Sequence, residues 1–451
     1  MSHSVSIRFP HTTFSALREQ LLADPTREAF AVLLARREQV NDLEILRVVD
    51  SRVPSAADYR DRGLTHLRME SDFIHRLLAE LTERADVDTL VDVHTHPFCP
   101  SGVAFSALDD ADERRFLGFI HQHFDDLHYA SIVLSQSDYA ARRWHLLEDE
   151  RHALDAEIRT QTAPEAWPRA DVRAPGMVLD EQWSRSVAAL GLETMGRITG
   201  DQRIGVVGVG GLGSIIAEHL IHMGFPELVL VDPDTLEPSN LNRVVGARAS
   251  DARRRLPKVR ALARHLRSIN PRARILSHQG GVADAAIQET LARCHWLMVG
   301  TDNHLSRFQA QQFCLRTGVG LISAGVNISA HDGAIQDMSG EVITVRLGDR
   351  LCLSCLQRIN PTALAADAHP EAGVREALVR RGYVVGREVV EPAVKTLNSA
   401  VATLAVDVLI NQYTGRQTHR PILVYENNRL PTIYPDEDSV RFRRPCFSCG
   451  G

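Results

Sequence analysis

The chain has 451 residues, of which 44% are hydrophobic and 24% are charged, and its formal net charge is −6 at pH 7. This composition is ordinary for a soluble globular protein of two domains, and its acidic balance gives no attraction to nucleic acid or to an anionic membrane. No apolar run approaches the ~20 residues that a membrane-spanning helix needs. The N-terminus also lacks the basic-then-apolar pattern of a secretory signal. We therefore expect a cytoplasmic protein.

The first part of the chain mixes short apolar runs with amphipathic stretches, which predicts a mixed α/β domain. We place this domain at residues 1–155. The expected strands cover Phe30–Ala35, Leu90–Val93 and Ala130–Leu134, and the expected helices cover Ser71–Arg84 and Ser106–Phe124.

The expected strand at Leu90–Val93 runs directly into His94-Thr95-His96-Pro97. Residues i and i+2 of a strand face the same side, so His94 and His96 can bind one metal ion. Asp109, at the start of the next helix, would be a third ligand, and three ligands leave one position for water, as in a catalytic zinc site. A His-x-His pair is expected about once by chance at this histidine content, and His121-Gln122-His123 is a second pair, which we assign to a solvated helix.

The context of the histidines carries more information than their spacing. The strand before them, the proline after them and the Ser106-x-x-Asp109 that follows resemble the JAMM (MPN/JAB) metalloproteases over residues 5 to about 150. The resemblance implies that Glu28 is the general base and that the Ser106 hydroxyl stabilises the oxyanion. Nine residues separate His96 from Ser106, where the family pattern has seven. A longer loop costs little, and we expect an active peptidase; the alternative is an insertion that displaces Ser106 and Asp109 and leaves a degenerate fold.

A second domain follows a linker. Residues 156–176 contain three prolines and no periodicity, which indicates the linker. From Arg203 a strand, a glycine turn, a helix and a strand follow one another, and strand–helix alternation continues to about Ile328. This pattern predicts a parallel, doubly wound, Rossmann-like sheet within a domain that we place at residues 177–451.

The glycine turn has the sequence GVGGLG, and it lies between an apolar strand and a helix. Such glycines permit a tight turn and a close approach of phosphates to a helix N-terminus. Asp232 follows at a spacing that would equally fit a nicotinamide-dependent dehydrogenase. Three later features favour a triphosphate with Mg²⁺ instead, because they add cations and a carboxylate. These features are DPDTLEPSNLNR (232–243), Lys258, which is one of only two lysines in the chain, and TDN (301–303).

Four of the seven cysteines form two Cys-x-x-Cys pairs near the end of the chain. One such pair would arise by chance only about one time in ten, so two pairs are a strong signal. Four thiolates fill a tetrahedral site and leave no position open, which predicts a structural zinc. The predicted ligands are Cys352, Cys355, Cys446 and Cys449.

Together these motifs resemble the ThiF/MoeB-like superfamily, which includes the ubiquitin-activating enzymes. The resemblance covers residues 177 to 451 and implies binding of MgATP and attack on its α-phosphate by the C-terminal carboxylate of a ubiquitin-like protein ending in Gly-Gly. It also implies a homodimer. By this resemblance, Asp232 would bind the ribose, Asp302 would bind Mg²⁺, and Arg185 would reach the ATP of a neighbouring subunit. The phosphates would be held by Asn240, Arg243 and Lys258. The other residues expected to bind the nucleotide are Gly208, Gly210, Gly211, Gly213, Asp234 and Asn303.

Both resemblances point to one substrate class, because a peptidase can trim or release the ubiquitin-like protein that the second domain activates. Relatives place a nucleophilic cysteine between the two cysteine pairs, but residues 356–445 contain none, and Thr396 and Ser399 are the nearby hydroxyls. The adenylate would then pass directly to a sulfur donor, to a conjugating enzyme or through an oxygen ester. Two other interpretations remain open: activation of a sulfur-carrier protein for biosynthesis, and a non-catalytic first domain that docks ubiquitin-like proteins.

Overall fold

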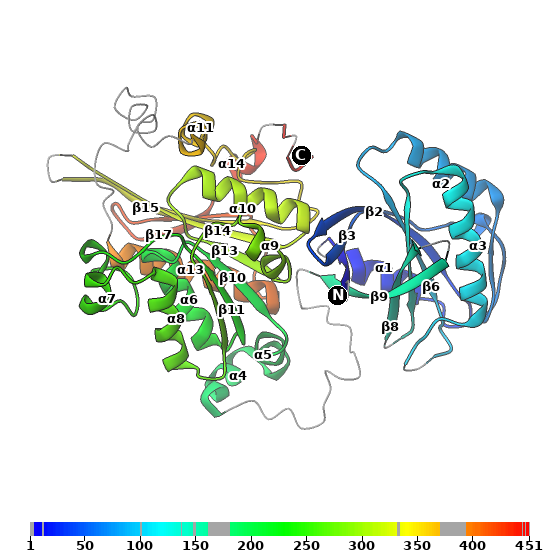
Figure 1. Cartoon of the computed structure of the whole chain (residues 1–451), viewed down its shortest axis with the longest axis horizontal. Coiled ribbons are helices and arrows are strands. Elements are labelled where there is room, and N and C mark those ends of the chain that lie inside the picture. The colour runs from blue at the N-terminus through cyan, green and yellow to red at the C-terminus, as the bar shows by residue number, and fades with distance from the viewer. Residues whose placement is uncertain are drawn as a thin grey trace. The chain divides into compact units, whose positions relative to one another are not determined.

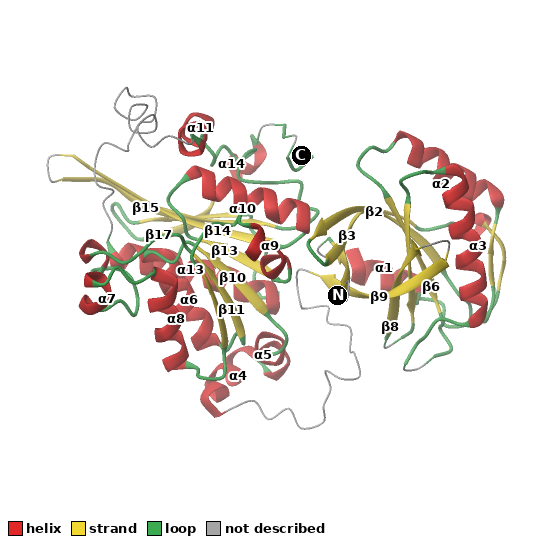
Figure 2. Cartoon of the chain, viewed as in Figure 1, coloured by secondary structure: helices red, strands yellow, loops and turns green. Residues whose placement is uncertain are grey.

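The computed structural model folds into two compact units, Met1–Val178 and Leu179–Gly451, which are described separately (Figure 1). In each unit helices flank a set of strands (Figure 2). None of the described helices is long and apolar enough to span a membrane. The structure describes residues 4–10, 13–99, 102–136, 138–147, 150–160, 181–331, 334–369, 394–443, 445–446 and 448–450.

The first unit is built on a barrel that closes in the order β1-β3-β2-β6-β7-β8-β9. Most neighbours are antiparallel, but β1 pairs in parallel with both β3 and β9, and β6 pairs in parallel with β7. The strands are β1 (Ser4–Phe9), β2 (Phe30–Val40), β3 (Leu43–Arg52), β6 (Thr89–Thr95), β7 (His128–Leu134), β8 (Tyr139–Leu147) and β9 (Glu150–Thr160), and a separate hairpin pairs β4 (Tyr59–Arg62) with β5 (Leu67–Met69).

The alternation of side chains along each strand divides the core of this unit in two. Residues such as Val91 and Val93 of β6 point into the barrel, where α1 (Thr13–Leu21) also buries its apolar face. Leu90 of the same strand points outward, into a second apolar cluster that α2 (Ser71–Glu83) and α3 (Ala107–His123) cover (Figure 1). The predicted helices and strands of this unit are therefore present within a few residues of their expected ends.

The end of the first unit differs from the predicted boundary at residue 155. Strand β9 continues to Thr160, and its last residues, from Ala156 on, pair with β1 and close the barrel. No local pattern predicts this pairing, because the partner strand lies at the other end of the unit. The rest of the predicted linker, residues 161–176, lies outside the described residues.

The second unit contains an eight-stranded sheet in the order β12-β11-β10-β13-β14-β15-β16-β17. The strands from β12 to β14 are parallel, as predicted, but β15, β16 and β17 extend the sheet as an antiparallel meander. The strands are β10 (Arg203–Val207), β11 (Glu227–Val231), β12 (Arg274–His278), β13 (Trp296–Val299), β14 (Gly320–His331), β15 (Ala334–Val345), β16 (Ile422–Glu426) and β17 (Thr432–Pro435).

Helices lie on both faces of this sheet, with α6 and α8 on one face and α10 on the other (Figure 1). The central parallel strands β10, β11 and β13 are almost continuously apolar, because both of their faces are buried. The helices are η4 (Glu181–Trp183), α4 (Ser184–Leu190), α5 (Leu192–Thr199), α6 (Gly211–Met223), η5 (Pro238–Asn240), α7 (Ala249–Arg253), α8 (Lys258–Ile269), α9 (Ala285–Ala292), α10 (His304–Thr317), α11 (Pro361–Ala368), α13 (Lys395–Thr414) and α14 (Glu437–Arg441).

Candidate metal centres and nucleotide site

The end of β6 and the start of α3 bring together the three predicted ligands of the first unit. His94 points outward from β6, and His96 follows the strand, where its backbone N–H donates to the Leu134 carbonyl at 2.8 Å. Asp109 lies in the first turn of α3. Its carboxylate accepts the backbone N–H of Ser106 at 2.6 Å, and the Ser106 hydroxyl accepts the N–H of Asp109 at 3.2 Å. This capping box fixes the direction of the Asp109 side chain.

The distances between these side chains fit one metal ion. Nε2 of His94 lies 3.4 Å from one carboxylate oxygen of Asp109, and Nε2 of His96 lies 3.5 Å from the other. Two nitrogen or oxygen ligands of a tetrahedral zinc are ~3.4 Å apart. Nε2 of His94 is buried and has no hydrogen-bond partner within the described residues. The donor set and its spacing therefore suit zinc.

Glu28 lies beside this cluster, just before β2. The start of β2 is tied to the end of β6, because the N–H of Ala29 donates to the Thr95 hydroxyl at 2.8 Å. Glu28 is 7% exposed. Burial raises its pKa to about 7; the nearby His94 opposes this shift and Asp109 adds to it. A carboxyl group with such a pKa suits a general base near neutral pH.

A cavity of about 390 Å³ opens beside the cluster. Its wall includes Glu28, both histidines, Ser106 and Asp109, and apolar residues such as Phe30 and Leu77 also line it. The two-residue insertion before Ser106 therefore leaves Ser106 and Asp109 next to the histidines. The second His-x-His pair is different, because His121 and His123 are exposed on α3, as predicted.

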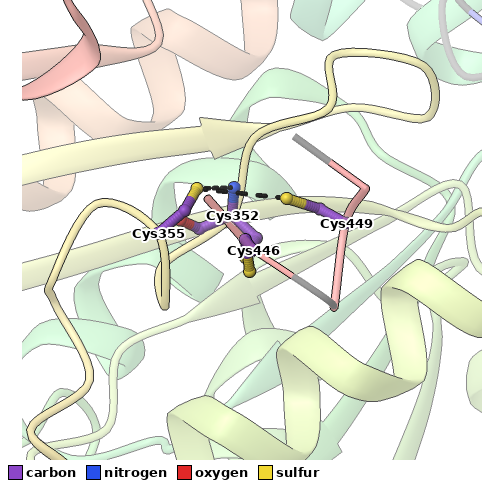
Figure 3. Close-up of side chains that lie close together, drawn as sticks. All are labelled: Cys352, Cys355, Cys446 and Cys449. Carbon is purple, nitrogen blue, oxygen red and sulfur yellow. Dashed lines mark hydrogen bonds between the residues drawn. The ribbon is translucent and has the colours of Figure 1, made fainter. Parts of the chain in front are cut away.

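The second unit brings the two cysteine pairs together (Figure 3). The sulfur of Cys352 lies 3.6 Å from that of Cys446, and the sulfur of Cys355 lies 4.0 Å from that of Cys449. Two thiolate ligands of a tetrahedral zinc are ~3.8 Å apart, so this donor set also fits the ion. A helix steadies both pairs, because α10 donates hydrogen bonds from Gln311 to Ser354 and from Gln312 to Ser448.

The glycine turn between β10 and α6 has little room for other side chains. Gly208 has a φ of +79°, and a Cβ atom there would lie 2.6 Å from Thr301. A Cβ atom on Gly213 would overlap the carbonyl oxygen of Gly208. At Gly210, by contrast, a Cβ atom would meet nothing within 4 Å. Gly208 and Gly213 therefore leave no room for a side chain, whereas the space around Gly210 is open. A phosphate can approach the N-terminus of α6 at this open position.

The acidic end of β11 is connected to this turn. Asp232 is 4% exposed, and its carboxylate accepts the N–H groups of Val209 at 2.8 Å and of Asp234 at 2.9 Å. Burial raises its pKa, and the charge of Lys258 opposes the rise. Lys258 is the first residue of α8, as predicted, and its Nζ donates to the Asp234 carboxylate at 2.7 Å.

The other predicted nucleotide ligands lie in the segments that surround the turn. The side chain of Arg243 packs against Gly211, the first residue of α6. A Cβ atom on Gly211 would lie 3.0 Å from the Cδ atom of Arg243. Asn240 is buried at the end of η5 and Asp302 is exposed before α10. Asn303 uses its side-chain oxygen to cap α10, with a 2.7 Å hydrogen bond from the Ser306 N–H.

Three further predicted residues lie on helices α4 and α13. Arg185 is exposed on α4, and Thr396 is exposed in the first turn of α13. Ser399 is partly buried one turn further along α13. Residues 370–393, which hold most of the segment that precedes α13, lie outside the described part of the chain.

One residue of this site was not predicted. Asn398, in the first turns of α13, is 3% exposed, and its amide nitrogen would lie 2.5 Å from a Cβ atom on Gly211. The asparagine lies close to Thr396 and Ser399 in the sequence, but no motif marks its amide as part of a site. Only the packing of α13 against α6 shows that it reaches the glycine turn.

Comparisons with known proteins agree with this architecture. Residues 183–439, more than half of the chain, match the model of the ThiF family, and residues 10–147 match the model of prokaryotic homologs of the JAB domain. A SAMP-activating enzyme E1 from Haloferax volcanii is 30% identical over 178 residues, which are 39% of this chain and 61% of that protein.

Other relatives cover a similar share of the chain. Ubiquitin-like modifier-activating enzyme 5 from Drosophila willistoni is 28% identical over 46% of this chain and 53% of that protein. A crystal structure of E. coli MccB aligns with 60% of this chain and 74% of that one, with a TM-score of 0.46 and 16% identity. The matches thus cover a little over half of the length of the first relatives. The chain belongs to the ThiF family and carries a JAB-type domain in front of its ThiF domain.

Proposed function

We propose that the second unit uses ATP to adenylate the C-terminal glycine of a ubiquitin-like protein, and that the first unit is a zinc peptidase that processes the same or a related protein. The observation that carries the proposal is the surroundings of the glycine turn. Gly208 lies against Thr301, next to Asp302, and Gly211 lies against Arg243. Asp302, which would bind Mg²⁺, thus follows a residue that contacts the turn, and the side chain of Arg243, which would bind phosphate, lies against the N-terminus of α6.

The names of the relatives support the substrate class. The relative from Haloferax volcanii is called a SAMP-activating enzyme, and the one from Drosophila willistoni is called an enzyme that activates a ubiquitin-like modifier. A JAB-type unit beside such an activating unit supports processing of the same kind of protein. Joining the two in one chain would raise the local concentration of the processed product at the activating site.

In the adenylation step, a carboxylate oxygen of the terminal glycine forms a bond to the α-phosphorus of ATP. The bond from that phosphorus to the oxygen bridging the α- and β-phosphates breaks, and pyrophosphate leaves. Asn240, Arg243 and Lys258 would hold the phosphates, and Asp232 would hold the ribose. A magnesium ion held by Asp302 would neutralise charge on the departing phosphates. In a homodimer, Arg185 would complete the site of the neighbouring subunit.

In the peptidase unit, His94, His96 and Asp109 would hold zinc, which supplies Lewis acidity to the scissile carbonyl and acidifies a water molecule. Glu28 would take the proton from the attacking water and deliver it to the leaving amine. Ser106 accepts a hydrogen bond from Asp109 and keeps its own O–H, which would donate to the oxyanion. The four cysteines would hold a second, structural zinc that fastens the chain end to α10.

The absence of a cysteine from residues 356–445 favours a second candidate function. Without a family-type thioester, the adenylate would pass directly to a sulfur donor, as in sulfur-carrier chemistry for cofactor or amino-acid synthesis. Transfer to a conjugating enzyme, or through an oxygen ester on Thr396 or Ser399, would serve protein conjugation instead. A third candidate makes the first unit a docking module without catalysis.

The test is ATP–pyrophosphate exchange by the full chain with a ubiquitin-like protein ending in Gly-Gly. Asp302→Ala should abolish the exchange and Glu28→Ala should leave it intact. Cleavage of a C-terminal extension on the same protein should show the opposite pattern. Exchange that survives Asp302→Ala would reject the nucleotide site, and cleavage that survives Glu28→Ala would reject Glu28 as the base. About two zinc ions per chain support both metal sites, and about one leaves only the cysteine site.

A further inference from the structure

A row of polar side chains lies under α3, behind the metal-binding cluster. The pairing of neighbouring strands places Asp92 of β6, Ser131 of β7 and Arg142 of β8 side by side. Their surroundings are apolar, because Leu90, Tyr129 and other members of the outer core cluster line the same face. Burying polar groups in such a place costs free energy unless each has a partner. Apolar packing alone therefore does not explain why these polar side chains are buried at this place.

Asp92 is the member of this row that is closest to the metal cluster. One of its carboxylate oxygens accepts a hydrogen bond from the hydroxyl of Tyr129, a residue that is 1% exposed. The other oxygen is buried, has no hydrogen-bond partner among the described residues, and lies 3.8 Å from Nδ1 of His94. On the opposite side of the imidazole, Nε2 faces Asp109 at 3.4 Å. The ring thus stands between two carboxylates, one at each nitrogen.

We propose that Asp92, held in place by Tyr129, is the positioning residue for His94. This inference rests on the zinc site of the proposed function. If Nε2 binds the metal, Nδ1 must carry the hydrogen, and the free oxygen of Asp92 is placed to accept it. A carboxylate in that position selects one tautomer, fixes the plane of the ring and makes the imidazole a better ligand.

The same row also holds the helix that carries the third ligand. The carboxylate of Glu113 accepts hydrogen bonds from Arg142 at 2.9 Å and from Trp144 at 2.5 Å. Arg142 in turn donates to Asp110 at 2.6 Å. Glu113 and Asp110 both belong to α3, so these bonds hold the start of that helix against the barrel, where Asp109 faces the histidines. The row orients two of the three ligands.

The experiment measures the zinc affinity of the full chain by competition with a chelator. Asp92→Ala should weaken binding at the histidine site by about 10- to 100-fold, as loss of such outer partners does elsewhere. Asp92→Asn should recover part of this loss, because its amide oxygen can still accept the hydrogen. Asp125→Asn is the matched control, since it makes the same change at an exposed carboxylate that follows α3, and it should leave the affinity unchanged.

The cysteine site provides an internal reference, and its affinity should be the same in every variant. In the zinc-loaded protein, the Nδ1–H proton of His94 should give a slowly exchanging NMR signal that Asp92→Ala removes. If Asp92→Ala binds zinc at the histidine site as tightly as the unmodified chain does, the inference is overturned. Tyr129→Phe, which keeps the aromatic packing, should also weaken zinc binding, and unchanged binding would remove Tyr129 from the scheme. An unmodified chain that binds only one zinc would instead reject the metal site of the proposed function.

Discussion

Replacing Lys258 by Met tests the nucleotide site most directly. Lys258 donates to Asp234 at 2.7 Å, but the Asp234 side chain is 63% exposed, whereas the Lys258 side chain is only 13% exposed. An ion pair with so exposed a partner contributes about 0–1 kcal/mol, so the ammonium group can move to a phosphate at little cost. A hydrogen bond between charged groups contributes about 1.5–3 kcal/mol. We therefore expect Lys258→Met to weaken MgATP binding by roughly 10- to 150-fold.

The assay is isothermal titration of MgATP into the full chain, which needs no ubiquitin-like protein. Arg416→Met is the control, because it removes one positive charge from an exposed pair with Asp407 at the far end of α13. It should bind MgATP as the unmodified chain does. Lys258→Arg should lose less affinity than Lys258→Met, since it keeps the charge. If Lys258→Met leaves the dissociation constant for MgATP unchanged, Lys258 does not hold the phosphates, despite its place at the start of α8.

Three further predictions concern the glycine turn, the cysteine site and the barrel. Gly213→Ala should abolish MgATP binding, because the added Cβ atom would overlap the Gly208 carbonyl and displace the turn; titration of the nucleotide measures this. Cys446→Ser should lower the zinc content from about two ions per chain to about one and reduce the thermal midpoint. Burial alone would raise the pKa of Glu44, but the nearby His145, whose Nε2 lies 3.4 Å from the carboxylate, and the charge of Arg143 hold it well below its ordinary value. Its stabilising effect is therefore present above pH ~4.5 and is lost as the pH falls further. Glu44→Gln should cost about 3–5 kcal/mol at pH 7, because Arg143 is left buried without its charge partner, and urea unfolding should show this difference shrinking in acid.

The sequence alone was enough for the features whose signals are local. HTHP follows a strand, GVGGLG joins a strand to a helix, and each Cys-x-x-Cys pair is complete within four residues. Such motifs are read from neighbours along the chain, because the backbone geometry of a strand or a turn already places their side chains. The same reasoning predicted Lys258 at the start of a helix, and the structure has it as the first residue of α8.

Tertiary structure decided what depends on residues far apart in the chain. The closure of the barrel by β1 and β9 moved the end of the first unit to Thr160 or beyond. The packing of α3 places Asp109 next to His94, although the loop between His96 and Ser106 is two residues longer than in the family pattern. Only the packing of helices and strands revealed that Asn398 reaches the glycine turn and that Asp92 stands behind His94. The sequence pattern around a polar side chain in an apolar strand does not reveal which residue it will contact. That contact depends on how distant segments pack together, and not on the spacing of residues within one segment.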